Sequence, residues 1–153
     1  MSEYVIRNAT EADILDIVLA VKQFCKEIPH PAWGKFEATK VKDLVSNLIE
    51  NEAGFVKVVV SDEEIVGALI ACATPLTINS FVFAQELMFW LDADHRNGKT
   101  SPKLIDSYVE WATRIGCNYI RLSTLDELLD SRVGILFKRK GFKPVETAYI
   151  KEV

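Results

Sequence analysis

The sequence predicts an α/β protein in which one mixed, twisted β-sheet is flanked by helices on both faces. The first half contains two neighbouring β-branched runs joined by a short polar turn, a pattern that is typical of a hairpin. The second half alternates strand-like and helical runs, as in a βαβ unit. The 153 residues contain no repeat, no low-complexity segment and no interdomain linker. We therefore expect a single domain over residues 1–153.

The N-terminal part predicts a strand followed by a helix. Residues 4–7 have the composition of a short strand. Thr10 is followed three residues later by Asp13, which is typical of a capping box with Asp in place of Glu. Apolar residues then recur at helical spacing, so we expect a first helix that runs to about Lys26.

The next part predicts a loop, a second helix and a hairpin. Residues 27–38 contain prolines, a glycine and aromatic residues, and we expect them to form a loop. Thr39 is expected to cap a second amphipathic helix, which should stop near Gly54. Residues 55–61 and 65–73 then have the composition of paired strands, with a polar turn between them.

The stretch from residue 86 to residue 116 predicts the centre of the fold. Residues 86–91 form a short apolar and aromatic run, which suits a strand buried on both faces. After a polar loop, Ser101 is a good N-cap. Pro102 suits the first helical turn, because its missing N–H would have no helical partner there. Apolar residues at helical spacing continue to Gly116, which should end the helix.

The C-terminal part predicts a strand over residues 118–123, a helix over 126–140 closed by Gly141, and a last strand within 145–151. The complete order is therefore β-α-α-β-β-β-α-β-α-β. A hairpin-rich first half followed by a βαβ unit requires a mixed sheet with helices on both of its faces.

Composition argues against several classes of function. A net charge of −4 argues against a general nucleic-acid binder and is compatible with attraction of a cationic amine. No apolar run approaches the ~20 residues that span a bilayer, and the N-terminus has no signal-peptide pattern. The cysteines Cys25, Cys72 and Cys117 lack metal-ligand spacing. We therefore expect no metal site, no membrane partner and a reduced, cytoplasmic setting.

The loop before the third helix has the features of an anion site. It contains Arg96, Gly98 and Lys99 between a buried strand and a helix N-terminus. The N–H groups of such a loop point outward with the positive end of the helix dipole behind them, and the two side chains add full charges. The alternative is an ordinary strand–turn–helix with a solvated basic loop.

This arrangement resembles the acyl-CoA-binding motif of the GNAT superfamily of N-acyltransferases. There the loop reads Arg/Gln-x-x-Gly-x-Gly/Ala, and its amides hold the pyrophosphate of acetyl-CoA. The corresponding residues here are Arg96, Asn97, Gly98, Lys99, Thr100 and Ser101. Lys99 stands where the family usually has glycine. Some phage and bacterial members share the glutamate, the aromatic residue and the arginine at Glu86, Trp90 and Arg96, with Ala93 here in place of proline.

The resemblance extends over nearly the whole chain. The end of the last helix, Phe137-Lys-Arg-Lys-Gly-Phe142, looks like the family's Tyr-x-x-x-Gly-Phe, and Tyr149-Ile-Lys151 resembles a Tyr-x-Lys ending. The opening Arg7-x-Ala-Thr-x-x-Asp is also common in the family. The resemblance implies a GNAT fold and an N-acetyltransferase. Its acyl donor would be acetyl-CoA and its acceptor an amine of a small molecule or a protein.

Glu86 is the best candidate for a general base. It lies within an apolar run, and partial burial would raise its pKa toward a value useful for taking a proton. Strand alternation places it on the same face as Met88 and Trp90 unless a bulge intervenes. The alternative is a partly exposed strand glutamate in a structural ion pair. The resemblance also implies that the backbone from Phe89 through Trp90 to Leu91 binds the thioester carbonyl and the pantetheine arm.

The general acid departs from the family pattern. Many members protonate the thiolate with a tyrosine at the position of Phe137, which cannot donate. Either Tyr149, Ser123 or water serves, or the thiolate leaves unaided, since its thiol has a pKa near ~8–9. The family's companion asparagine position holds Asp130 here.

The loop between the first two helices offers further candidates. Cys25 and His30 form no nucleophile motif, and a buried structural cysteine is the simpler interpretation. The resemblance places His30, Trp33 and Phe36 beside the acceptor site. Aromatic rings there either hold an aliphatic amine by cation–π contact or pack on the second helix.

Two classes of function follow. Arg96, Gly98, Ser101 and Glu86 favour an enzyme. Phe137 and Lys99 favour a catalytically weak or inactive GNAT-fold binding module that acts through a protein partner. The acceptor and homodimer formation both stay open at this point.

Overall fold

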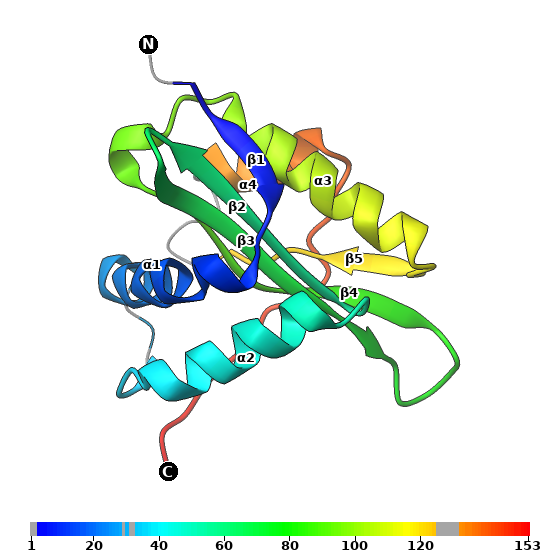
Figure 1. Cartoon of the computed structure of the whole chain (residues 1–153). Coiled ribbons are helices and arrows are strands. Elements are labelled where there is room, and N and C mark those ends of the chain that lie inside the picture. Colours follow the sequence, from blue (N-terminus) through cyan, green and yellow to red (C-terminus); the bar gives the residue numbers. More distant parts are fainter. Residues whose placement is uncertain (1–2, 29, 31–32, 125–131) are drawn as a thin grey trace.

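The fold is built around one five-stranded sheet with the strand order β1-β2-β3-β4-β5 (Figure 1). The computed structural model describes residues 3–28, 30, 33–124 and 132–153. The strands are β1 (Val5–Asn8), β2 (Gly54–Ser61), β3 (Glu64–Pro75), β4 (Val82–Leu91) and β5 (Tyr119–Arg121). Strands β1 to β4 pair antiparallel, and β5 runs parallel to β4. The expected mixed sheet is therefore confirmed.

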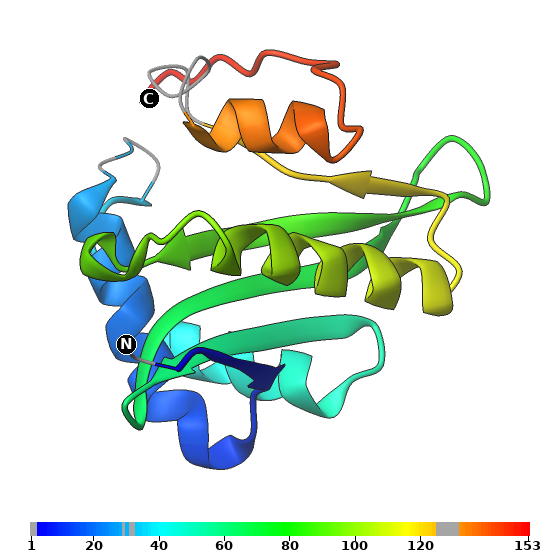
Figure 2. The same ribbon diagram turned by 90° about the horizontal axis from the view of Figure 1, so that it is seen from above.

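Helices cover both faces of the sheet. They are α1 (Ile14–Glu27), α2 (Ala38–Glu50), α3 (Thr100–Arg114) and α4 (Arg132–Arg139). The first two pack on one face and α3 packs on the other (Figures 1 and 2). α4 lies on the α3 side, where the ring centroid of Phe137 is 5.9 Å from that of Phe89 in β4. No helix in the described ranges is long and apolar enough to cross a membrane.

Each face of the sheet has its own apolar core, and β4 contributes to both. Met88 and Trp90 belong to the core under α1 and α2, and Leu91 belongs to the core under α3. Successive side chains of a strand point to opposite faces, so a strand covered on both faces is apolar throughout. This is why residues 87–91, which follow Glu86, form a continuous apolar run.

Two helices end at glycines, as expected. Gly116 and Gly141 have φ angles of +84° and +88°, in the left-handed region that favours glycine. After α3, the Cys117 N–H donates to the Ala112 carbonyl at 2.9 Å and the Gly116 N–H donates to the Thr113 carbonyl at 3.2 Å. This pair of hydrogen bonds is a Schellman motif, and the same pair closes α4.

The expected start of the second helix is wrong. α2 begins at Ala38, so Thr39 lies inside it. The residue before the helix is Glu37, whose carbonyl accepts a hydrogen bond from the Val41 N–H at 3.2 Å. The helix therefore starts two residues earlier than a cap at Thr39 would place it, and no side chain caps it. It also ends earlier than expected, and Gly54 is the first residue of β2.

Three strand expectations also need correction. β4 begins at Val82 rather than at residue 86, and β5 is shorter than the expected 118–123. Residues 145–151 form no strand and pair with none of the five strands that the structure describes. The helix expected over 126–140 is present from Arg132, and its first residues lie outside the described ranges.

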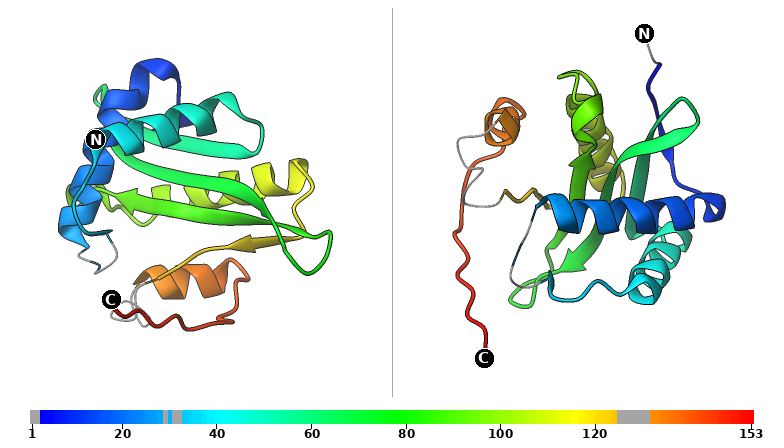
Figure 3. Two further views of the ribbon diagram at one scale, coloured as in Figure 1. Left: turned by 90° about the horizontal axis from the view of Figure 1, so that it is seen from below. Right: turned by 90° about the vertical axis from the view of Figure 1, so that its left-hand side faces the viewer.

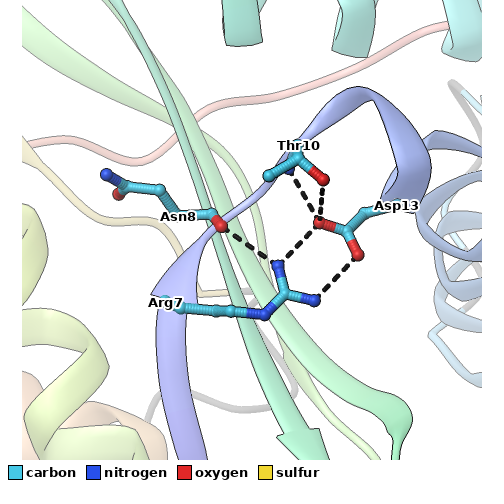
Figure 4. Close-up of polar contacts among 4 residues, drawn as sticks. All are labelled: Arg7, Asn8, Thr10 and Asp13. Carbon is cyan, nitrogen blue, oxygen red and sulfur yellow. Dashed lines mark hydrogen bonds and ion pairs between the residues drawn. The ribbon is translucent and has the colours of Figure 1, made fainter.

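An ion pair joins β1 to the start of α1 (Figure 4). The Arg7 guanidinium donates to both carboxylate oxygens of Asp13, at 2.7 and 2.9 Å. The same carboxylate accepts from the Thr10 N–H at 2.7 Å, which is the expected capping contact. The hydrogen bonds from Arg7 are the main cause that lowers the pKa of Asp13 to about 2. The Arg-x-Ala-Thr-x-x-Asp pattern therefore has a structural role.

Asp13→Asn should lower the free energy of unfolding at pH 7 by about 1.5–3 kcal/mol, because it removes hydrogen bonds to a charged group. The folded-state pKa of Asp13 is lowered from 3.8 to about 2. Its stabilisation is therefore present above about pH 4 and is lost as the pH falls toward 2. Urea unfolding of both proteins along this pH range measures the difference. Asp16→Asn, an exposed carboxylate one turn on, is the matched control. A loss that is equal for both variants, or independent of pH, would contradict this role.

Candidate active site

A β-bulge in β4 decides which way the Glu86 side chain points. The register between β3 and β4 shifts by one residue at Leu87, which has no partner of its own in β3. Because side chains alternate between the two faces, one extra residue inverts the alternation. Met88 therefore lies in the core under α1 and α2, whereas Glu86 shares the α3 face with Phe89 and Leu91.

The Glu86 carboxylate lies where β4 and β5 begin to separate. Its Oε2 accepts a hydrogen bond from the Ser123 N–H at 3.2 Å, just after the end of β5. Burial raises the pKa of Glu86 to about 7, and this hydrogen bond offsets part of the rise. Burial, and second to it the Glu86 carboxylate, raise the pKa of Tyr108 in α3. Among the described residues, Glu86 forms no ion pair. A carboxyl group of this kind can exchange a proton at neutral pH.

β4 and β5 pair over a short distance and then separate. The paired positions are Phe83 with Tyr119, Ala84 with Ile120, and Gln85 with Arg121. β4 continues to Leu91, so the edge of β4 after Gln85 has no strand partner in the described ranges. We call this parting of β5 from β4, which begins beside Glu86, the opening; along it the β4 backbone after Gln85 has no partner strand on the β5 side in the described ranges.

The pairing with β3 shows which β4 amides face this opening. The Asp92 N–H donates to a β3 carbonyl at 2.8 Å. Hydrogen-bonded and non-hydrogen-bonded pairs alternate along an antiparallel ladder, so the Trp90 N–H also points toward β3. The N–H groups of Phe89 and Leu91 then point away from β3, into the opening. The Leu91 carbonyl agrees with this assignment, since it accepts from Arg96 Nε at 2.8 Å.

Glu27, the last residue of α1, is a site residue that the sequence did not indicate. Its Oε1 accepts from the Arg96 guanidinium, and its Oε2 accepts from Trp90 Nε1 at 2.9 Å. No local pattern could have found it, because it lies 69 residues from Arg96 in the sequence. Arg96 is thus held by protein groups on two sides, and it fixes the loop after β4 against α1.

The N-cap residue of α3 is Lys99, and the Asn97 side chain, rather than that of Ser101, binds the amides at the start of the helix. Its Oδ1 accepts from the N–H groups of Lys99 at 2.9 Å and of Thr100 at 3.0 Å. The helix begins at Thr100, so Ser101 lies inside its first turn and the expected N-cap is wrong. Gly98 has φ +75°, which explains a glycine at this position of the loop.

The strand edge and the loop fit the two ends of acetyl-CoA to different extents. The pantetheine arm is an extended chain with amide groups, which matches the unpaired N–H groups of Phe89 and Leu91. The pyrophosphate meets a loop in which the Asn97 side chain already takes two amides and Glu27 already holds Arg96. The strand edge therefore fits the donor directly, whereas the loop offers a pyrophosphate fewer free amides than the motif indicates.

Of the proposed proton donors, the structure brings only Ser123 to the carboxylate, through its backbone N–H. Phe137 is buried against Phe89, so this position presents an apolar ring. Tyr149 is 94% exposed in the C-terminal segment. Asp130 lies outside the described residues.

Two cavities lie away from Glu86. One of about 870 Å³ lies between the C-terminal parts of α2 and α3. Another of about 400 Å³ is lined by Cys25, His30, Trp33 and Phe36. The ring centroids of His30 and Trp33 are 5.4 Å apart, so the aromatic loop residues gather beside α1. In the described part of the chain, no group of three side chains could hold a metal ion.

Asn97→Ala should lower the free energy of unfolding by about 0.5–2 kcal/mol, the usual effect of removing a side chain that accepts hydrogen bonds from amides at a helix N-terminus. The measurement is urea unfolding at neutral pH. Asn47→Ala is the matched control, since Asn47 is exposed within α2 and alanine is the better helix former there. Equal stability of the parent and Asn97→Ala would contradict the cap.

No protein-family model matches the chain, and no curated protein matches it. Several solved structures do match the chain. A transcriptional regulator from Bacillus halodurans C-125 is 21% identical, with a TM-score of 0.77, over 99% of this chain and 100% of its own. An aminoglycoside N-acetyltransferase in complex with CoA is 16% identical, with a TM-score of 0.77, over 100% of this chain and 96% of its own.

A third structure, a GNAT family acetyltransferase from Staphylococcus aureus, is 15% identical, with a TM-score of 0.66, over 100% of both chains. At such identities the similarity shows the fold alone. It agrees with a mixed sheet flanked by helices. The chain has the GNAT fold.

Proposed function

We propose that the protein is an N-acetyltransferase that transfers an acetyl group from acetyl-CoA to a primary amine of a small molecule or a protein. One observation carries the proposal. At the separation of β4 from β5, unpaired N–H groups of Phe89 and Leu91 lie along the same strand edge as Glu86, a carboxyl group with a pKa of about 7. The fold supports it, because acetyltransferases share the fold and one of them was solved with CoA.

Each part of this opening supplies something that acyl transfer needs. Backbone N–H groups at the strand edge donate to the thioester carbonyl and stabilise the oxyanion that develops on it. The Glu86 carboxylate accepts a proton from the attacking amine, directly or through one water. The amine nitrogen then bonds to the carbonyl carbon, the C–S bond breaks, and CoA leaves as its thiolate.

The loop after β4 would bind the pyrophosphate. The positive end of α3 and the exposed Lys99 ammonium attract it. Arg96 contributes by fixing the loop through Glu27. Phe137 offers no proton to the thiolate, so solvent protonates it. A thiol with a pKa near ~8–9 needs little assistance to leave.

Glu86→Gln should lower kcat/KM by about 10²–10⁴-fold, the usual contribution of a general base, with little change in the Kd for CoA. In the parent, kcat/KM should rise with pH and level off above about 7, since the carboxylate is the active form and its pKa is about 7. This inflection should be missing in Glu86→Gln. A panel of amines assayed by release of free CoA gives the profile. Glu64→Gln, an exposed carboxylate in β3, is the control.

The pH dependence of the free energy of unfolding reports the pKa of Glu86 independently of catalysis. The folded-state pKa is raised from 4.5 to about 7, so the folded protein binds more protons between these values. Stability should therefore fall as the pH rises through this range, and Glu86→Gln should remove that slope. Loss of the slope with unchanged turnover would contradict the catalytic role of Glu86 while leaving its burial intact.

A further inference from the structure

β5 follows β4 for three paired positions and then leaves it. The last of these positions pairs Gln85 with Arg121. Beyond it the chain turns away from β4 on the side of α4 (Figures 2 and 3). Parallel strands stay paired where each backbone N–H finds a carbonyl across the ladder. The groups that would form the next hydrogen bond of the ladder therefore decide where the pairing ends.

The next hydrogen bond of the ladder would join the Ser123 N–H to the Glu86 carbonyl. The Val82 carbonyl faces β5, since it accepts from the Asn118 N–H at 2.7 Å. Backbone groups alternate between the two edges of a strand, so the Glu86 carbonyl, four residues on, also faces β5. In a parallel ladder, such a carbonyl meets the N–H one residue beyond its opposite position, which for Glu86 is Ser123.

Side-chain groups bind both members of this expected pair instead. Gln85 Nε2 donates to the Glu86 carbonyl at 2.9 Å. The Ser123 N–H donates to the Glu86 carboxylate at 3.2 Å. The carbonyl and the N–H are thus both satisfied, but not by each other, so the ladder ends without unpaired backbone groups at this position. Tyr108 fixes the end of β5, because its hydroxyl donates to the Arg121 carbonyl at 3.0 Å.

We propose that Gln85 is a positioning residue of the active site: its side-chain amide occupies the Glu86 carbonyl, ends the pairing of β4 with β5 and leaves the Ser123 N–H for the Glu86 carboxylate. Without this donor, the Ser123 N–H would pair with the Glu86 carbonyl and extend the ladder. The carboxylate would then lose the hydrogen bond that favours its charged form. The catalytic importance of Gln85 rests on the proposed function, whereas its effect on the hydrogen bonds does not.

The surroundings of Glu86 allow its titration to be followed at Ser123. Tyr108 faces Glu86 from α3, and burial together with the Glu86 carboxylate raises the pKa of Tyr108. Tyr108 therefore stays neutral near pH 7. Arg121, the charged residue of β5, pairs with Glu146 at 3.1 Å. A response of the Ser123 N–H near pH 7 therefore reports the carboxylate to which it is bonded.

The Ser123 amide signal in ¹H–¹⁵N NMR spectra tests these hydrogen bonds. In the parent, its chemical shift should change with pH around the Glu86 pKa of about 7, because the N–H is bonded to the titrating carboxylate. Gln85→Met keeps the length of the side chain but removes the donor, so most of this change should be lost. Gln23→Met, at an exposed glutamine of α1, is the matched control and should keep it.

A second variant restores the donor. Gln85→Lys carries an ammonium group at a similar distance from the backbone, so the Ser123 amide should again respond to pH. A parent protein whose Ser123 amide does not respond near pH 7 overturns the proposal, whether or not the variants fold. An unchanged response in Gln85→Met overturns it as well.

The pH profile of acetyl transfer separates positioning from a merely structural role. In Gln85→Met, the inflection of kcat/KM should move upward by about one pH unit, because the carboxylate has lost a hydrogen bond to its charged form. A lower Tm with an unmoved inflection would overturn the positioning role of Gln85. If the parent acetylates no amine while Ser123 responds as expected, the proposed function fails and the role of Gln85 in ending the ladder is supported.

Discussion

The one-residue bulge at Leu87 is the constraint on which the site depends. Without it, alternation would place Glu86 with Met88 and Trp90 in the core under α1 and α2. An uncompensated carboxylate there would be very unfavourable. With the bulge, Glu86 lies on the α3 face next to the end of β5. There, partial burial brings its pKa into the neutral range without removing it from the opening.

The shortness of β5 is the second constraint. Three paired positions are enough to hold β5 beside β4, and the strands then part. The inner side of this parting exposes the N–H groups of Phe89 and Leu91. The outer edge of β5 is left without a strand in the described ranges. One short strand therefore underlies the proposed donor site.

Contacts from distant parts of the chain keep the site in place. The carboxylate of Glu27 joins α1 to Trp90 of β4 and to Arg96 of the following loop. Tyr108 of α3 donates to the Arg121 carbonyl at 3.0 Å and so links the helix behind the opening to β5. Helices on both faces of the sheet thus hold the strands whose separation forms the site.

Local sequence patterns predicted most of the helices and strands. The features that they missed depend on tertiary contacts. The order of strands and helices, Gly116 and Gly141 follow from periodicity and capping. Glu86 was recognisable as a carboxylate in an apolar run, but a one-residue bulge has no composition signal. Residues 145–151 have strand composition, yet composition alone does not bring a segment to a neighbouring strand, and these residues pair with none of the described strands.

Local sequence patterns also could not predict the side-chain contacts of the loop after β4. Asn97 and Ser101 both have side chains that can bind helix N-terminal amides, and only the geometry of the loop brings that of Asn97 to the amides of Lys99 and Thr100. Glu27 meets Arg96 only because α1 ends beside the loop that follows β4.

The central claim is that the free edge of β4 binds the pantetheine arm of acetyl-CoA. Hydrogen exchange of single backbone amides, followed by NMR with and without CoA, tests it most directly. The N–H groups of Phe89 and Leu91 should exchange rapidly in the free protein and become protected when CoA is added. The Trp90 N–H, paired with β3, should be protected in both states. Protection of Phe89 and Leu91 that is already complete without CoA, or unchanged at saturating CoA, would contradict the account.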